Sequence, residues 1–531
     1  MSKKLDEYTK EELISYIRQL QKDTKFGLVW NPKEEQVAID CRTRVPVLRE
    51  VSQKTIAKAD EGDPTHLLLE GDNYHSLSVL NYTHAGRINV IYIDPPYNTG
   101  NKDFIYNDHY VDKEDPYRHS EWLSFMDNRL RLAKNLLAST GTIFISIDDN
   151  EYAHLKILCD KIFGEENFIT SIIWQRKRGR DNSAKYFSKS HEYLLVYSRI
   201  KNAPTLNKIN MDEGTKKAYR NPDNDPRGAY RLLGAWARGT QGGSRYEFIS
   251  KNGKIFSERL WLFAKSRMLE LDRDDRLVFV GDKVYRKLFL SEHTGSVPET
   301  VWADTSNAAN AADEIKTIFG KQVFDTVKPL PFIKRILQIA TDKNGIILDF
   351  FAGSGTTGHA VLQLNAQDGG KRQFILGTNN ENGIAENITY ERIDRVINGY
   401  SGTQGIPAKL RYYKTDFVNT NNLDSLTDKD RLEIAKEMAV MVALHENSFD
   451  QVEQTDYWQT YENNIQVTAI YYREDKTRIQ EYIDKLNTQD KHVKLYIFGW
   501  GKNVGREYAS KKISVEDIPE PLIELYREIT K

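Results

Sequence analysis

The sequence predicts an α/β fold in which a doubly wound, mostly parallel sheet is covered by helices on both faces. Short apolar runs at 67–72, 88–94, 142–148 and 192–198 alternate with stretches of helical periodicity. These runs do not alternate apolar with polar residues, which indicates strands that are buried on both faces. The same rhythm returns after residue 327, so one sheet is expected to be built from two separate stretches of chain.

The individual elements follow in chain order. Thr9 and Glu12 have the spacing of a capping box, so a short amphipathic helix is expected to begin near Lys10. Apolar residues between 122 and 137 recur at helical spacing and predict a helix that packs on the sheet. Beyond the polar middle of the chain, the sequence predicts a helix at 329–341, a strand at 345–350, a glycine-rich turn, a helix at 358–365 and a strand at 372–377.

The middle and the end of the chain depart from this rhythm. Asn-Pro, Asp-Pro and Gly-Gly dipeptides punctuate a polar segment in the middle, which predicts an inserted domain. The tail after Tyr413 has an α+β pattern with a strand at 493–499. The expected organisation is therefore an N-terminal helical appendage (1–60), two halves of the α/β core (61–200 and 320–415) around the insert (201–319), and a C-terminal domain (416–531).

Charge is distributed unevenly along the 531 residues. Lys and Arg total 75 against 76 Asp and Glu, so the overall balance does not predict a polyanionic partner. Residues 172–221, however, contain twelve basic and four acidic residues, and residues 222–290 contain fourteen and nine. Residues 420–531 contain fifteen basic and twenty-one acidic residues. The basic middle is the part expected to face phosphates, whereas the acidic tail is suited to protein contacts.

Several classes of protein are disfavoured by composition. Cys41 and Cys159 are the two cysteines, too few for a disulfide framework or a thiolate zinc site, and no metal is predicted. The first residues lack the apolar region of a signal peptide, and no apolar run approaches the ~20 residues of a membrane helix. The expected location is therefore the cytoplasm, with no membrane partner.

The first motif with chemical content follows the predicted strand at 88–94. Asp94, Pro95, Pro96 and Tyr97 place a carboxylate and an aromatic ring at the C-terminal edge of the sheet, where open α/β folds bind ligands. Two consecutive prolines fix φ and remove backbone donors, so Asp94 and the Pro95 carbonyl can accept hydrogen bonds from an amino group. Tyr97 offers a face on which a nucleobase can stack. The alternative is a turn whose aspartate caps a helix.

The second motif is a glycine turn after the predicted strand at 345–350. Residues 348–358 read Leu-Asp-Phe-Phe-Ala-Gly-Ser-Gly-Thr-Thr-Gly, and the glycines allow the backbone to approach a ligand closely. His359 stands where a phosphate loop carries its lysine, which disfavours nucleotide triphosphate binding. The match of Gly353, Gly355 and Gly358 to the dinucleotide pattern is weak, because bulky threonines follow Gly355.

Together the two motifs resemble the catalytic and cofactor motifs of DNA amino-methyltransferases of the β group. In that family the Asp-Pro-Pro-Tyr motif precedes the target-recognition region and the Phe-x-Gly-x-Gly motif, and this chain has the same permuted order. Further matches at 141–151, 190–198, 327–337 and 388–396 look like modification subunits of type III restriction-modification systems. The resemblance implies a Rossmann-like fold that uses S-adenosylmethionine, with Asp94, Pro95, Pro96 and Tyr97 as catalytic residues.

The resemblance also implies a set of cofactor-binding residues: Asp349, Phe350, Phe351, Gly353, Gly355, Thr356, Thr357, Lys328, Asp72 and Glu381. Three of these have an alternative explanation. Lys328 precedes Pro329 and can simply begin a helix, and Asp72 can be a solvated turn residue. Glu381 lies beyond Thr378, the nearest residue to the position where the family carries a ribose-binding acid.

Basic residues in the middle of the chain are the predicted contacts to DNA. Those before the fourth predicted strand interleave with Tyr186 and Phe187, as expected around an extruded base, although a solvated basic loop is the alternative. In the insert, Trp236, Tyr246 and Trp261 could read groove edges or could form a local core. The predicted DNA-binding residues are Arg176, Lys177, Arg178, Arg180, Lys185, Lys189, Arg238 and Arg245.

The sequence thus predicts a site-specific methyltransferase that acts on adenine N6 of double-stranded DNA by base flipping, without a metal or covalent intermediate. Cytosine-N4 methylation is an alternative, since the family distinguishes the two bases imperfectly at the position of Asp94. A DNA-binding regulator that acts without a restriction partner is another. The resemblance further implies a homodimer, an assembly role for the C-terminal domain, and a type III restriction subunit as partner, because no helicase phosphate loop is evident in this chain.

Overall fold

The computed structural model describes residues 9–10, 14, 28, 30, 34–41, 44–100, 103–106, 109–204, 206–209, 211, 213–237, 242–419, 427–472, 476–498 and 505–518. These residues form two compact units. One runs up to Leu206 and resumes at Glu299, and we call it the body. The other comprises Asn207–Pro298, and we call it the insert unit. The N-terminal helix predicted to begin near Lys10 falls largely outside the described residues.

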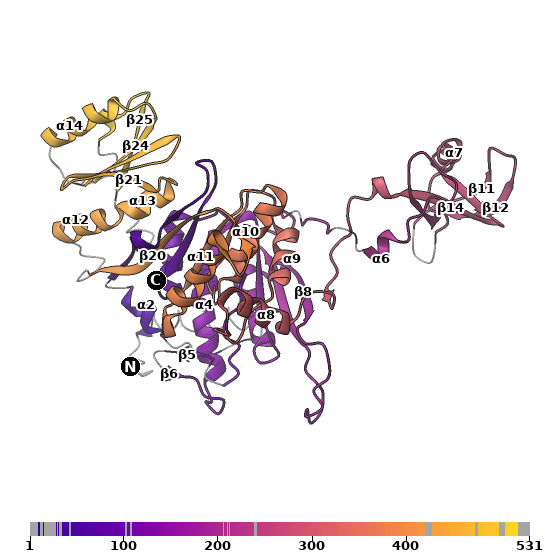
Figure 1. Ribbon diagram of the computed structural model, residues 1–531, viewed down its shortest axis with the longest axis horizontal. Helices are drawn as coiled ribbons and strands as arrows, with labels where there is room; N and C mark the ends of the chain where they lie inside the picture. The colour runs from indigo at the N-terminus through magenta and orange to yellow at the C-terminus, as the bar shows by residue number, and fades with distance from the viewer. Residues whose placement is uncertain are drawn as a thin grey trace. The chain divides into compact units, whose positions relative to one another are not determined.

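An eleven-stranded sheet forms the centre of the body (Figure 1). Its middle strands are mutually parallel and run in the order β20 (Lys409–Asn419), β3 (Thr65–Glu70), β17 (Gln373–Thr378), β16 (Ile346–Asp349), β4 (Ile88–Ile93) and β7 (Leu137–Ile147). On one edge, β1 (Arg44–Glu50) and β2 (Ile56–Ala57) pair with β20 in antiparallel fashion. The strands predicted at 88–94 and 345–350 are therefore direct neighbours, although about 250 residues separate them.

Helices cover both faces of this sheet, which confirms the doubly wound α/β fold. On one face, α3 (Asn73–Thr83), α4 (Arg118–Leu136) and α5 (Tyr152–Phe163) share a core with Leu67, Ile91 and Ile143. On the other, Tyr92 contacts Phe332 of α9 (Leu330–Ala340). Also in the body are α10 (Thr356–Asp368), α11 (Glu391–Asn398) and α8 (Ala308–Phe319). Successive side chains of a strand point to opposite faces of the sheet, so the neighbouring residues Ile91 and Tyr92 belong to the cores on opposite faces.

The other edge of the sheet differs from the predicted parallel arrangement. β9 (His191–Ser198), which corresponds to the strand predicted at 192–198, pairs antiparallel with both β7 and β8 (Phe168–Gln175). β15 (Val301–Trp302) then adds to β8 in parallel. Residues 299–319, which the sequence pattern places in the insert, accordingly belong to the body: β15 completes the sheet, and Glu314 of α8 pairs with the buried Arg392 of α11.

The C-terminal part of the body carries a second sheet. Its order is β21 (Asp450–Gln454), β22 (Trp458–Glu462), β23 (Gln466–Tyr471), β24 (His492–Phe498) and β25 (Ile513–Ile518). β24 corresponds to the strand predicted at 493–499. The helix α14 (Lys476–Asn487) packs on this sheet through Ile479, Tyr482 and Leu486. Two further helices, α12 (Asp428–Glu437) and α13 (Ala439–His445), precede it.

The insert unit has small antiparallel sheets around its own core. One sheet contains β10 (Tyr230–Gly234), β14 (Lys283–Phe289) and β13 (Leu277–Val280), and β11 (Ser244–Ile249) pairs with β12 (Ile255–Trp261). The helix α7 (Lys265–Arg273) contributes Met268 and Leu271 to a core that also contains Phe248 and Trp261. Trp261 is fully buried and Trp236 and Tyr246 pack against it, so these aromatic residues form the local core. Across the described part of both units, no helix combines the length and the apolar character needed to cross a membrane.

Candidate active site

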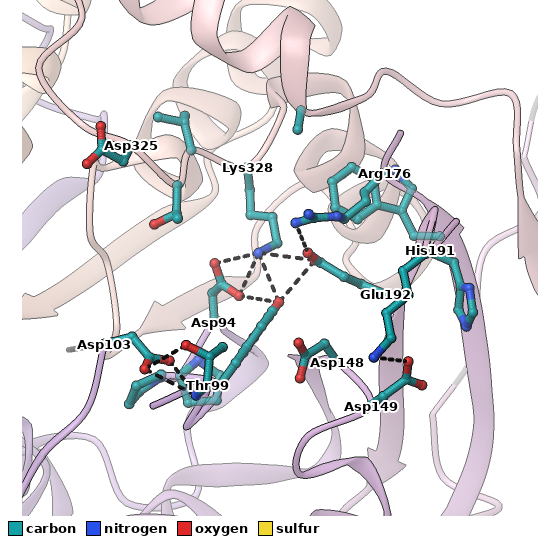
Figure 2. Close-up of a pocket in the computed structure, with 18 of the residues that line it drawn as sticks. Asp94, Thr99, Asp103, Asp148, Asp149, Arg176, His191, Glu192, Asp325 and Lys328 are labelled. Carbon is teal, nitrogen blue, oxygen red and sulfur yellow. Dashed lines mark hydrogen bonds and ion pairs between the residues drawn. The ribbon is translucent and has the colours of Figure 1, made fainter. Parts of the chain in front are cut away.

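A cavity of about 640 Å³ opens at the C-terminal end of β4 in the body (Figure 2). It lies at the sheet edge where the chain leaves one strand for the next helix, the position at which open α/β folds bind ligands. Many charged side chains line it, together with the four predicted catalytic residues, Asp94, Pro95, Pro96 and Tyr97. The other lining residues include Asp148, Asp149, Trp174, Arg176, Lys189, His191, Glu192 and Lys328. Sequence positions from 94 to 328 thus meet in one site.

The Asp94 carboxylate is held by an ammonium group inside this cavity. Lys328 Nζ lies 2.7 Å from each of the two Asp94 carboxylate oxygens and donates to the Tyr97 hydroxyl at 3.0 Å (Figure 2). The lysine side chain is 11% exposed and that of Asp94 is 21% exposed, so the ion pair is largely removed from water. Lys328 therefore neutralises the predicted catalytic aspartate, an interaction that the sequence does not predict.

Glu192 is the second acid of the site and was not among the predicted residues. Its Oε2 accepts a hydrogen bond from the Tyr97 hydroxyl at 3.1 Å and lies 3.5 Å from Lys328 Nζ. Its Oε1 accepts from Arg176 at 2.9 Å. The Tyr97 hydroxyl also lies 2.9 Å from Asp94, so it sits between the two carboxylates and its single proton can go to either of them. A charged residue within the otherwise apolar run 192–198 was the signal that could have identified Glu192.

The charges of this network shift the pKa values of Asp94, Glu192 and Lys328. Burial raises the pKa of Asp94, and the nearby Lys328 acts against this effect. Burial would also raise the pKa of Glu192, but Lys328 and Arg176 outweigh it and hold that pKa below its ordinary value. Burial alone would lower the pKa of Lys328, yet the two carboxylates raise it. The site therefore keeps a protonated lysine beside buried acids.

The Asp-Pro-Pro-Tyr turn is anchored from outside the cavity. The Trp122 indole donates to the Pro96 carbonyl at 2.8 Å, which fixes the turn to α4. Asn98 follows Tyr97 with a positive φ of 56° and donates to the fully buried Glu151 at 2.6 Å. Glu151 also pairs with His119 and His154, whose ligand-type atoms lie within 4.8 Å of one another and of the carboxylate. The predicted helix-capping role of Asp94 does not occur, since Lys328 and Tyr97 occupy its oxygens.

The glycine turn lies beside this site because β16 and β4 are neighbours, with Leu348 opposite Ile91. Gly353 and Gly355 have φ values of 48° and 77°, a conformation that side-chain-bearing residues rarely adopt. A Cβ at Gly355 would meet Thr389 at 3.3 Å. The backbone therefore packs closely against Thr389 before α10 begins at Thr356.

Asp349 connects the strand end to the glycine turn. One carboxylate oxygen accepts from the Phe351 amide at 3.1 Å and the other from the Thr357 hydroxyl at 2.5 Å. Burial raises the pKa of Asp349 to about 7, and the charge of Asp94 adds to the increase. Thr356 accepts a hydrogen bond from the buried Arg392 at 2.8 Å. The side chains of Asp349, Thr356 and Thr357 are therefore engaged in holding the turn.

The remaining predicted cofactor residues have different surroundings. Phe350 is buried in the sheet core, whereas Phe351 is partly exposed and packs beside it. Asp72 caps α3 by accepting from the Tyr74 amide at 2.7 Å, and it also pairs with Arg129. Glu381 is exposed at the start of a short helical turn after β17. Asp72 thus caps a helix and pairs with a buried arginine, which differs from the solvated turn residue of its alternative explanation.

Most of the predicted DNA-binding residues lie on the connection between β8 and β9, residues 176–190. Arg176 and Lys189 line the cavity, and Lys189 pairs with Asp149 at 3.2 Å. Lys177 lies 3.8 Å from Asp181. In the insert unit, Arg245 is exposed on β11. Arg238 lies outside the described residues.

This chain is similar to a family of DNA methylases and to individual proteins of known sequence. The model of a DNA methylase family for N6 and N4 enzymes matches residues 88–391. The StyLTI Mod subunit, a type III restriction-modification enzyme of Salmonella typhimurium, is 38% identical over 381 residues, which cover 66% of this chain and 58% of that protein. The type II methyltransferase M.KpnI of Klebsiella pneumoniae is 37% identical over 352 residues, 60% of this chain and 82% of the relative.

A third relative extends the match. The EcoPI Mod subunit of Escherichia phage P1, also a type III restriction-modification enzyme, is 31% identical over 435 residues, covering 69% of this chain and 66% of that protein. This chain therefore spans about three fifths of the StyLTI Mod subunit and about two thirds of the EcoPI Mod subunit. The matched family region contains both the Asp-Pro-Pro-Tyr turn and the glycine turn.

Proposed function

The chain belongs to the DNA methylase family, and from this we propose that it transfers a methyl group from S-adenosylmethionine to the N6 amino group of adenine in double-stranded DNA. The observation that carries the proposal is the convergence of Asp94 and Tyr97, at the end of β4, on a charged cavity beside the glycine turn of β16. Family membership supports the reaction class, and the presence of a carboxylate and an aromatic ring in one cavity supports the assignment of these residues to it.

The chain's own residues suit an amino group as the reacting partner. An adenine amine is a weak nucleophile because its lone pair is delocalised into the ring. The Asp94 carboxylate can accept from this amine and orient it, and the Tyr97 ring can stack on the base. Glu192 holds the Tyr97 hydroxyl, which limits rotation of the ring. Rate acceleration then comes from orientation and electrostatics rather than from a covalent intermediate.

The cofactor is proposed to lie against the glycine turn, where it supplies an electrophilic methyl group. Gly353 and Gly355, whose φ values are positive, support this assignment, because they leave these two positions of the turn without side chains at the end of β16, next to β4. We assign the cofactor contacts to the turn and to residues near it, with Asp72 and Glu381 at the periphery. The assigned residues are Asp349, Phe350, Phe351, Gly353, Gly355, Thr356, Thr357, Lys328, Asp72 and Glu381. For Phe350, Thr356 and Thr357 the contribution would come from the backbone, because their side chains are buried.

DNA is proposed to contact the β8–β9 connection and the insert unit. The connection supplies Arg176, Lys177, Arg178, Arg180, Lys185 and Lys189, which can neutralise phosphates around an extruded base. The insert unit, with Arg245 and Arg238, is assigned the choice of sequence, because base-edge contacts specify whereas phosphate contacts position. The tail, with its acidic excess, is assigned to protein assembly.

Two biological settings are supported by the relatives. The names of the StyLTI and EcoPI proteins support a modification subunit of a type III restriction-modification enzyme. We extend this to a cytoplasmic homodimer that works with a type III restriction subunit. The 82% coverage of M.KpnI, a type II methyltransferase, supports the second candidate, an enzyme that acts without such a partner. Because the matched family includes N4 enzymes, cytosine is the alternative target base.

The experiment that tests the reaction incubates duplex DNA with the protein and methyl-labelled S-adenosylmethionine and then identifies the labelled nucleoside after digestion. N6-methyladenine is the expected product, and the Asp94→Ala variant should form none of it while still binding the cofactor. Absence of label from all four nucleosides in the wild-type reaction would refute the proposed activity. Label in N4-methylcytosine would keep the enzyme class and change the base.

A further inference from the structure

The connection between β8 and β9 carries two aromatic side chains that are almost fully exposed. Tyr186 is 80% exposed and Phe187 is 89% exposed, and among the large hydrophobic side chains of the described residues none is more exposed. The two rings are adjacent in sequence, at a turn that extends beyond the end of β8 (Figure 1). An exposed apolar pair of this kind marks a surface that a partner covers.

The turn that carries these rings is organised by local hydrogen bonds. The Lys177 amide donates to the Ser190 carbonyl at 3.2 Å, which closes the base of the connection. The Asp181 amide donates to the Ser188 hydroxyl at 2.7 Å, and Asp181 accepts from the Ser183 amide and hydroxyl. The rings are thus presented at a structured tip, where less order must be gained on binding.

The charge around the rings restricts the kind of partner. Residues 176–190 contain six basic residues and a single acidic residue, Asp181, which already pairs with Lys177. Lys185 Nζ lies 5.2 Å from the centre of the Tyr186 ring. Cations interleaved with exposed aromatic faces match a ligand that offers both phosphates and flat bases. An acidic protein or an anionic membrane surface could also bind cations and aromatic rings, so the position of the connection has to decide between these partners.

The position of the connection decides between partners. Its first residue, Arg176, and its penultimate residue, Lys189, both line the cavity that holds Asp94 and Tyr97. A base that enters this cavity leaves a gap in the duplex, and the bases on either side of the gap lose a stacking partner. Because both ends of the connection line the cavity, the connection extends from the cavity rim, which is where that gap would form.

We propose that Tyr186 and Phe187 insert into the DNA duplex and stack on the bases exposed when the target base is extruded. The proposal rests on the proposed DNA methyltransferase function and goes beyond it by assigning the residues that replace the base. Stacking of an aromatic side chain on a base compensates part of the cost of extrusion, and the basic flanks hold the adjacent phosphates. Asp94 and Tyr97 then receive the base, whereas Tyr186 and Phe187 keep the duplex open behind it.

The test compares the Tyr186→Ala/Phe187→Ala double variant with wild type on a duplex that contains the methylated sequence. Single-turnover methylation by the double variant should be slower by about thirtyfold or more, because loss of each aromatic–base stack costs at least about fivefold and the variant loses two. The cofactor affinity should be unchanged, because the rings lie on the β8–β9 connection and not on the glycine turn. Ile465→Ala is the matched control, since Ile465 is 78% exposed in the turn between β22 and β23, and its rate should equal that of wild type.

A second substrate distinguishes insertion from a general weakening of DNA binding. When the nucleotide opposite the target adenine is abasic, extrusion breaks no base pair, and the double variant should recover to within about threefold of wild type. A duplex with 2-aminopurine in place of the target adenine reports extrusion directly, and its fluorescence should rise with wild type and much less with the double variant.

The inference is overturned if the double variant methylates the intact duplex at the wild-type rate, or if the abasic substrate leaves the defect unchanged. A changed oligomeric state of the variant, with normal 2-aminopurine fluorescence, would also overturn it and would assign the rings to a protein contact. The wild-type reaction tests the proposed function separately. If the wild-type protein transfers no methyl group to any duplex, the proposed methyltransferase function is refuted, and the role of the two rings is not what failed.

Discussion

Replacing Lys328 with methionine removes the cation that contacts both carboxylate oxygens of Asp94 and lies 3.5 Å from Glu192. At a separation of 2.7 Å, two unit charges attract by about 6 kcal/mol at an effective dielectric constant of about 20. Much of this attraction offsets the cost of burying the charges, and removing one partner of a buried pair typically costs about 3–5 kcal/mol. We expect the free energy of unfolding of the body to fall by that amount near neutral pH.

The loss should depend on pH in a defined direction. Without Lys328, burial and mutual repulsion raise the folded-state pKa of Asp94 further above its unfolded value. The pKa of Glu192, which the wild-type site holds below its ordinary value, rises as well because one of the cations that lower it is gone. A carboxyl group with a raised folded-state pKa costs nothing below its unfolded pKa and becomes destabilising as pH rises. Each pH unit of acidification should therefore recover up to about 1.4 kcal/mol for each proton that the folded variant takes up.

The assay is urea unfolding of wild type and Lys328→Met, side by side near neutral pH and near pH 5. Lys189→Met is the matched control, because Lys189 and Asp149 form an ion pair at 3.2 Å with side chains 73% and 42% exposed. Such an exposed pair is worth less than about 1 kcal/mol. A Lys328→Met variant that is as stable as wild type near neutral pH, or whose loss grows on acidification, would refute the account of the charge network.

Four further predictions concern the glycine turn, its aspartate, the basic connection and the insert unit. Gly353→Val, a β-branched residue at a φ of 48°, should weaken S-adenosylmethionine binding by tenfold or more in calorimetry, and unchanged affinity would place the cofactor elsewhere. Burial raises the pKa of Asp349 to about 7 in the folded state, whereas an unfolded chain releases this proton at about pH 4. The contribution of Asp349 to the free energy of unfolding is therefore fully present below about pH 4 and is lost as pH rises through 7. Asp349→Asn should remove about 4 kcal/mol of this pH dependence in unfolding titrations, and an identical pH profile for variant and wild type would contradict the assignment. Neutralising Arg176, Lys177 and Arg178 together should flatten the plot of log affinity for DNA against log salt concentration. The slope should fall by about 0.9 for each phosphate that these side chains neutralise in the wild-type complex. Sequence preference should be retained, and an unaltered slope would exclude phosphate binding by these residues. Exchange of residues 207–298 for the corresponding part of a relative should change the methylated sequence but not the cofactor affinity, and an active chimera that kept the original sequence would move recognition out of the insert unit.

The parts of the fold that could be predicted from the sequence are those with strong local signals. The apolar runs that became β4 and β16 and the amphipathic helix α9 lie close to their predicted bounds. The family resemblance drawn from the order of the two motifs is confirmed by the match over residues 88–391. Pairing of β4 with β16 then brings the motifs together, which local periodicity alone does not indicate.

What could not be predicted depends on pairing between distant segments. An apolar run such as 192–198 has the same pattern whether its neighbour is parallel or antiparallel, so the antiparallel β7–β9–β8 edge was not predicted. Glu192 becomes part of the site only because this edge places it beside Tyr97. Lys328 was assigned to the cofactor by resemblance, and its ion pair with Asp94 depends on a chain path across 234 residues. Residues 299–319 lacked the rhythm of the core and were therefore assigned to the insert.

The central claim is that this chain methylates adenine N6 in DNA through Asp94. Single-molecule sequencing of genomic DNA from otherwise identical cells that carry wild-type protein, the Asp94→Ala variant or no protein tests the claim most directly. The account predicts N6-methyladenine at one recurring sequence with the wild-type protein and at none with the other two. Adenine methylation that persists in cells with Asp94→Ala, or that is the same with and without the wild-type protein, would contradict it.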